Sequence, residues 1–182
     1  MTMQDSPEVT DDLRAAARER PGGWVYAIDA LVDPDARVPG HSIRGGWPVD
    51  ANGEVNDAGF TPNPHYRPHQ PDVGEVVSAV EALLSGRPTE RALVAIGRAA
   101  VTIAVTDSGP PVVERAEPAI EAFVTENDAR GAYPDARGWT RTTVRDLASH
   151  LTDGVGLEVV LPDGRRAGIR ATGIAGLLGN MR

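Results

Sequence analysis

Two histidines stand at a spacing that could hold a metal ion. His65 and His69 are four residues apart, which would place both imidazoles on one face of a helix. Four prolines occupy residues 61–71, however, and proline at this density is incompatible with a regular helix. No third ligand follows at a suitable spacing. The sequence therefore predicts no metal site.

The serines and glycines show no pattern typical of catalysis or phosphate binding. No serine lies in a Gly-x-Ser-x-Gly motif, and the chain contains no lysine for a P-loop. Neighbouring carboxylates, such as Asp11 and Asp12, are interpreted as solvated surface charge. We therefore expect no catalytic residues, no cofactor and no enzymatic activity. An active site assembled from residues far apart in the sequence is the alternative.

Aromatic and arginine side chains near expected loops form a second kind of candidate site. Such side chains provide most of the binding energy in protein interfaces. A stiff, proline-rich loop also loses less entropy when it docks. The predicted contacts with a partner protein are Trp47, Phe60, Tyr66, Arg67 and Tyr133. For the three tryptophans, packing in the core is the competing interpretation.

The excess of acidic over basic residues indicates which kind of macromolecule the chain could bind. The chain has 26 acidic and 18 basic residues, a formal net charge of −8. Proteins that bind DNA or RNA need a basic surface, so a nucleic-acid partner is not expected. An acidic surface would speed the approach of a basic protein. The same charge also keeps a small protein soluble, and this second interpretation stays open.

The periodicity of the chain predicts an α+β fold. Helices alternate with groups of strands, which favours a mixed, mostly antiparallel sheet with helices packed on it. We expect helices at residues 7–20, 72–86, 89–97, 142–151 and 172–178, and strands at residues 24–29, 41–49, 54–60, 101–106, 112–115, 119–125, 155–161 and 165–170. The Asn52-Gly53 pair predicts a hairpin between the strands at 41–49 and 54–60. Residues 127–138 are expected to form a polar loop.

Length and terminal sequence set the expected organisation and location. The 182 residues suit one domain, with an N-terminal helix within 1–21 and a tail at 171–182. No apolar run reaches the roughly 20 residues that a membrane-spanning helix requires. The acidic first twelve residues are unlike a secretory signal, and cysteine is absent. The sequence therefore predicts a cytoplasmic protein without a membrane partner.

Two ordered series of short motifs resemble actinobacterial type VII secretion-associated proteins and the SseB-like domain. The first series comprises residues 24–29, 46–54 and 63–68, and the second comprises 122–125, Trp139, 145–147 and 153–157. The resemblance extends from Trp24 to Ile169. It implies a single SseB-like α+β domain with a non-enzymatic role beside a secretion locus.

The resemblance also implies a partner. One branch of such proteins is similar to the immunity factor of the tuberculosis necrotizing toxin, which blocks the cleft of a secreted NAD-cleaving enzyme. We therefore expect an immunity protein that inhibits a cognate toxin. The alternative is an adaptor or chaperone that binds a secretion substrate.

Overall fold

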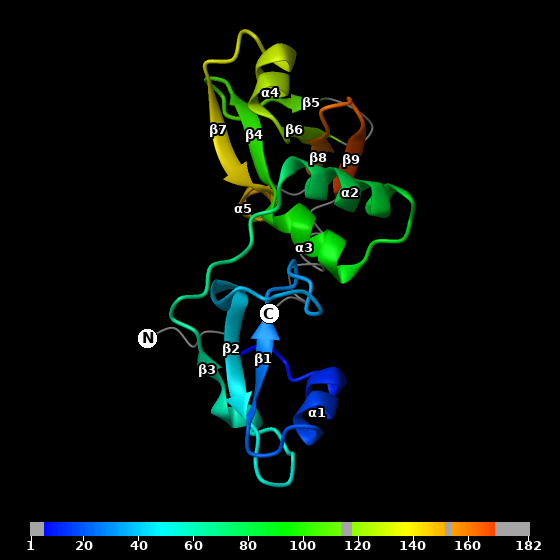
Figure 1. Ribbon diagram of the computed structural model, residues 1–182. Helices are drawn as coiled ribbons and strands as arrows, with labels where there is room; N and C mark the ends of the chain where they lie inside the picture. The colour runs from blue at the N-terminus through cyan, green and yellow to red at the C-terminus, as the bar shows by residue number, and fades with distance from the viewer. Residues whose placement is uncertain (1–5, 114–117, 152–153, 170–182) are drawn as a thin grey trace. The chain divides into compact units, whose positions relative to one another are not determined.

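The computed structural model describes residues 6–113, 118–151 and 154–169, and these residues form two compact units (Figure 1). One unit ends at His69 and the next begins at Gln70. The boundary lies in the proline-rich segment 61–71, which the sequence predicted to be a stiff loop. The single domain expected over residues 1–182 stays a prediction. The expected helix at 172–178 and the tail lie outside the described residues.

The first unit consists of one helix and a three-stranded sheet. Helix α1 (Asp11–Arg18) begins at Thr10, whose hydroxyl accepts a hydrogen bond from the Leu13 N–H at 3.3 Å. The antiparallel strands β1 (Trp24–Ile28), β2 (Ile43–Pro48) and β3 (Thr61–Pro62) lie in that order across the sheet. A 3-10 turn, η1 (Gly40–Ser42), leads into β2.

The strand predicted at 54–60 does not form. Asp50 closes the turn instead, because its carboxylate accepts hydrogen bonds from the N–H groups of Asn52 and Glu54, both at 2.8 Å. After one bridge between Val49 and Val55, the chain turns into the 3-10 segment η2 (Asp57–Gly59). The strand that pairs with β2 is the two-residue β3, which contains Pro62. Proline is tolerated there because β3 is an edge strand.

The core of the first unit lies between α1 and one face of its sheet. Its buried residues are Ala17, Val25, Ala27, Trp47 and Val49. The ring of Phe60 packs against Trp47, with centroids 4.8 Å apart. Trp47 is therefore the central side chain of a small core.

The second unit begins with two capped helices. Helix α2 (Val73–Leu84) has a capping box, in which Asp72 and Glu75 each accept the other's backbone N–H. Helix α3 (Glu90–Arg98), which was expected at 89–97, is capped by the Thr89 hydroxyl. The two helices pack against each other.

The second unit contains a six-stranded mixed sheet. Strands β7 (Gly138–Thr143), β4 (Ala100–Val105), β6 (Ala119–Phe123), β8 (Gly156–Val160) and β9 (Arg166–Ile169) lie in that order, and β5 (Val112–Val113) pairs with β6. All pairs are antiparallel except β6 with β8. The predicted α+β class with a mostly antiparallel sheet is confirmed.

Residues 126–143 differ from the prediction. Helix α4 (Glu126–Ala132) replaces most of the expected loop, and β7 precedes the short helix α5 (Val144–Ala148) where a longer helix was expected. Only Ala129 of α4 is buried, so this helix has no apolar stripe that would reveal it. It is stabilised by its Thr125 cap and by an ion pair between Glu126 and Arg130.

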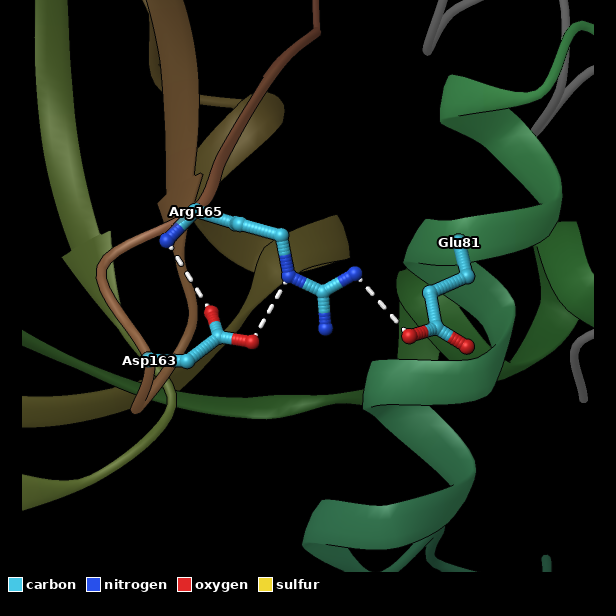
Figure 2. A network of polar contacts seen from close by, with 3 residues as sticks. All are labelled: Glu81, Asp163 and Arg165. Carbon is cyan, nitrogen blue, oxygen red and sulfur yellow. Dashed lines mark hydrogen bonds and ion pairs between the residues drawn. The ribbon is translucent and has the colours of Figure 1, made fainter.

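An ion network joins α2 to the turn between β8 and β9. Arg165 donates through Nε to Asp163 Oδ2 at 2.7 Å and through Nη1 to Glu81 Oε1 at 2.9 Å (Figure 2). All three side chains are exposed, so solvent screens these ion pairs and they contribute little to folding.

Candidate functional site

The predicted contact residue Trp47 is buried, and this prediction is wrong. Its side chain is 0% exposed and lies in the core of the first unit. A partner cannot reach a side chain in that position. The competing interpretation, core packing, holds for Trp47.

Two other predicted residues of the first unit serve its internal structure. Phe60 is half-buried, packs on Trp47 and lies over Gly45. Tyr66 is half-buried, and its hydroxyl donates a 2.6 Å hydrogen bond to Asp29 Oδ2. Both side chains leave only part of their surface to solvent.

Arg67 and Tyr133 lie in different units. Arg67 is exposed, and its backbone N–H donates to the His41 carbonyl at 2.8 Å. Tyr133 belongs to the second unit, where its ring meets Phe123 edge-on and its hydroxyl donates to Glu121 Oε2 at 2.9 Å. Phe60 packs on the buried Trp47 within the first unit. The five predicted residues are therefore divided between a core, the surface of the first unit and the second unit.

Carboxylates in the second unit are held by an arginine. Arg166 forms ion pairs with the buried Glu121 and with Glu158. Hydrogen bonds to Glu121 and then Glu158 raise the pKa of Arg166. One guanidinium therefore pairs with two carboxylates on this sheet.

A small hollow lies beside Tyr133. It has a volume of about 240 Å³ and is lined by Thr106 and residues 132–136. Pockets for small molecules usually enclose about 300–1,000 Å³. This hollow is therefore smaller than a usual small-molecule binding pocket.

The histidines of the proline-rich segment do not form a metal centre in the described structure. The N–H of His65 donates to Asn63 Oδ1, and the N–H of His69 donates to Asp29 Oδ2. Across residues 6–113, 118–151 and 154–169, no three His, Asp or Glu side chains gather where they could hold a metal ion. Within these same ranges, none of the helices combines the length and apolar character that a bilayer crossing requires.

Two exposed aromatic residues on β1 form the surface that the sequence analysis missed. Trp24 is 43% exposed and Tyr26 is 48% exposed, whereas Val25 and Ala27 between and beside them are buried. The strand therefore presents its small apolar residues to the core and its large aromatic ones to solvent. The period-two alternation of this strand is the sequence signal for the pattern, but it does not show which face is buried, and core packing was the competing interpretation for Trp24.

The backbone of β1 adds to this surface. Hydrogen bonds from Val49 N–H to the Gly23 carbonyl and from Asp29 N–H to the Ser42 carbonyl show which residues of β1 face β2. Trp24 and Tyr26 alternate with these residues, so their backbone N–H and C=O groups point away from β2. Pro48, the β2 residue paired with Trp24, has no N–H to donate. The backbone groups of Trp24 and Tyr26 therefore point to the outer edge of the sheet, where no backbone–backbone hydrogen bond to them occurs among the described residues. We call this edge, with the side chains of Trp24 and Tyr26, the β1 edge.

Carboxylates precede and follow β1 in the segments that flank it, where the arginines Arg18, Arg20 and Arg37 are also exposed. The Asp50 carbonyl accepts from Gly22 N–H at 2.8 Å, which places the turn containing Asp50 and Glu54 beside the start of the strand. Backbone N–H groups of Glu54 and Asn52 lower the pKa of Asp50, so this carboxylate is charged at neutral pH. Asp33 and Asp35 are exposed in the turns that follow the strand.

The arrangement suits the binding of a protein segment. It combines exposed aromatic side chains, a strand edge and flanking negative charge. In comparisons with known proteins, no protein-family model, no curated protein and no solved structure matches this chain.

Proposed function

We propose that this chain is a non-catalytic protein-binding protein, and specifically an immunity protein that inhibits a cognate secreted toxin. The observation that carries the proposal is the exposed aromatic pair Trp24 and Tyr26 on a strand edge. Large aromatic side chains are costly to leave in water and are enriched in binding hot spots. Their exposure is explained if a partner covers them.

The charge of the chain supports a basic protein partner. With a net charge of −8, the chain would attract such a partner over several ångströms and accelerate their encounter. Fast, tight association is what a producing cell needs against a toxin that it makes itself. The specific role as an immunity protein, and a NAD-cleaving enzyme as its target, come from the resemblance to type VII secretion-associated proteins.

The proposal is tested by capture followed by an activity assay. The tagged chain is incubated with native cell extract, washed at high salt, and the retained protein is identified and assayed for NAD cleavage with and without the chain. We expect one retained toxin whose activity is abolished at equimolar chain. A retained secretion substrate without toxic activity would favour an adaptor, and retention of no protein would refute the protein-binding function.

A further inference from the structure

The β1 edge has the properties of a site for adding a strand. The outward N–H and C=O groups of Trp24 and Tyr26 form a row at the sheet's edge, and no described residue pairs with them through its backbone. Such a row is a template on which an extended chain can form a ladder of hydrogen bonds. Many proteins protect such edges with charged residues or proline, but the five residues of β1 include neither.

The side chains on the solvent face of β1 would give such a strand an apolar surface to cover. Trp24 and Tyr26 lie two residues apart on this face, and Gly46 and Pro48 stand opposite them on β2. A Cβ on Gly46 would lie 2.9 Å from the Tyr26 ring, so the ring rests close against the β2 backbone. An apolar residue on the added strand would contact both aromatic rings.

The charge of the partner is inferred from the net charge of −8 of the chain, to which carboxylates near β1 contribute. Asp50 and Glu54 lie near the start of β1, and Asp33 and Asp35 follow its end. None of the four forms an ion pair with a described residue. A strand with arginine or lysine at both ends would therefore be attracted, and an acidic strand would be repelled.

A second copy of this chain fits the edge poorly. Antiparallel pairing of β1 with itself would bring the start of one strand to the end of the other. Each copy carries a net charge of −8, so like charges oppose the approach of two copies. The charge pattern favours a heterologous, basic segment.

We infer that the β1 edge binds an extended segment of a basic partner protein, which joins the sheet as an additional strand beside β1. The segment has apolar residues where it faces Trp24 and Tyr26, and arginine or lysine at its ends. This inference rests on the proposed protein-binding function and names the surface that performs it.

The first test is selection from a random ten-residue peptide library displayed on phage, with the full chain as bait. We expect enriched peptides with alternating apolar residues between basic ends. N-methylation of alternate backbone nitrogens in a synthetic enriched peptide should weaken binding at least about tenfold, because each methyl group removes a ladder hydrogen bond. Selection of acidic or proline-rich peptides, absence of enrichment, or indifference to N-methylation would overturn the inference.

Variants of the chain locate the binding surface. Trp24→Ser combined with Tyr26→Ser should weaken binding of the enriched peptide at least about tenfold, the loss expected for binding anchors. The matched control is Leu84→Ser, which removes a side chain that is 52% exposed in the second unit and should change affinity less than about twofold. Equal binding by all three proteins would place the peptide elsewhere and refute the β1 edge as the site.

Two further measurements separate the remaining outcomes. Glu54→Gln with Asp35→Asn should weaken binding and reduce its salt dependence, since neither side chain forms a hydrogen bond or ion pair with a described residue. Sedimentation that shows a dimer dissociated by Trp24→Ser would mean that a second copy occupies the edge, which overturns the inference. If the doubly substituted Trp24 and Tyr26 variant still inhibits the captured toxin, the proposed function stands and only the surface is wrong.

Discussion

Asp29 is a buried carboxylate whose hydrogen bonds hold the proline-rich segment against the first unit. It is 1% exposed and accepts from the Leu31 N–H at 3.0 Å, the Tyr66 hydroxyl at 2.6 Å and the His69 N–H at 3.2 Å. The donors come from residues up to 40 positions away in the sequence. A buried carboxylate tolerates this position because several donors compensate for its lost hydration.

The Asp29 site gives the first prediction. Asp29→Asn replaces one of the two acceptor oxygens with an NH₂ group, so at least one buried donor loses its partner. The substitution should destabilise the first unit by about 1.5–3 kcal/mol. Tyr66→Phe removes one donor and should cost about 1 kcal/mol. Urea unfolding measures both changes, and an unaltered midpoint for Asp29→Asn would contradict the assigned network. Arg67→Gln, whose exposed side chain forms no hydrogen bond or ion pair with a described residue, is the control.

The Arg165 network gives a prediction about pH. The backbone N–H of Arg165, and next its side chain, lower the pKa of Asp163. Because the folded-state pKa is lowered, these bonds stabilise the folded protein above the ordinary aspartate pKa. That contribution is lost as the pH falls through the lowered value.

Arg165→Gln tests this assignment. The backbone donor remains and the guanidinium is lost, so the pKa of Asp163 should rise toward the ordinary value while staying below it. A carboxyl-carbon NMR titration measures the change. Arg137→Gln, on another exposed ion pair, should leave Asp163 unaltered. A titration of Asp163 that is identical in both variants would show that the Arg165 side chain does not act on it.

At the scale of elements, two glycines allow the strands of the first unit to approach closely. A Cβ on Gly45 would lie 2.5 Å from both the Phe60 ring and the Thr61 carbonyl oxygen. The glycine pair 45–46 is visible in the sequence, but the side chains that cover it come from distant segments. The rings of Phe60 and Tyr26 occupy those positions on opposite faces of β2.

This packing predicts the effect of a single methyl group. Gly45→Ala should destabilise the protein by about 1–3 kcal/mol, because neither the backbone oxygen nor the packed ring can move freely. Gly168→Ala in β9 is the matched control, because its added Cβ would meet no atom within 4 Å. Thermal unfolding measures both variants. Equal midpoints would mean that the first unit relaxes around the methyl group at no cost.

Element prediction succeeded where short-range chemistry determines structure. The apolar spacing of residues 72–86 predicted α2, and α3 forms where a helix was expected at 89–97. Prediction failed at α4 and β7, where the chain is polar and stability comes from contacts with other elements. Arg130 of α4 lies over the ring of Trp139 in β7 at 4.0 Å, a cation–π contact that neither segment reveals by itself.

At the scale of the whole molecule, each unit encloses its own buried cluster. The cluster around Trp47 belongs to the first unit, and that of Phe123, Ala129 and Val160 belongs to the second. A core substitution should therefore be felt most strongly in its own unit, because the lost contacts are local.

Hydrogen exchange tests this division. Val80 is 0% exposed, so Val80→Ala should cost about 2 kcal/mol and lower the amide protection of the second unit. Protection at β1 and β2 should change much less. An equal loss of protection in both units would show that they unfold as one cooperative domain, as the sequence analysis expected for residues 1–182.

The sequence by itself determined the α+β class, the two capped helices of the second unit, most strand positions and the acidic character of the chain. These features depend on residues within about four positions of one another or on composition. Among the candidate site residues, Trp47 is a core side chain, and the binding role of Phe60, Tyr66, Arg67 and Tyr133 stays a prediction.

Only the tertiary structure decided which aromatic residues are exposed. Trp24 and Trp47 lie in neighbouring strands, and they differ because Trp47 stands opposite the buried Val25 whereas Trp24 stands opposite Pro48 on the other face of the sheet. That phase depends on how α1 and Phe60 pack, and a shift of one residue would exchange the two faces. Pairing and packing between distant segments therefore placed Trp47 in the core and left Trp24 and Tyr26 exposed on an edge strand.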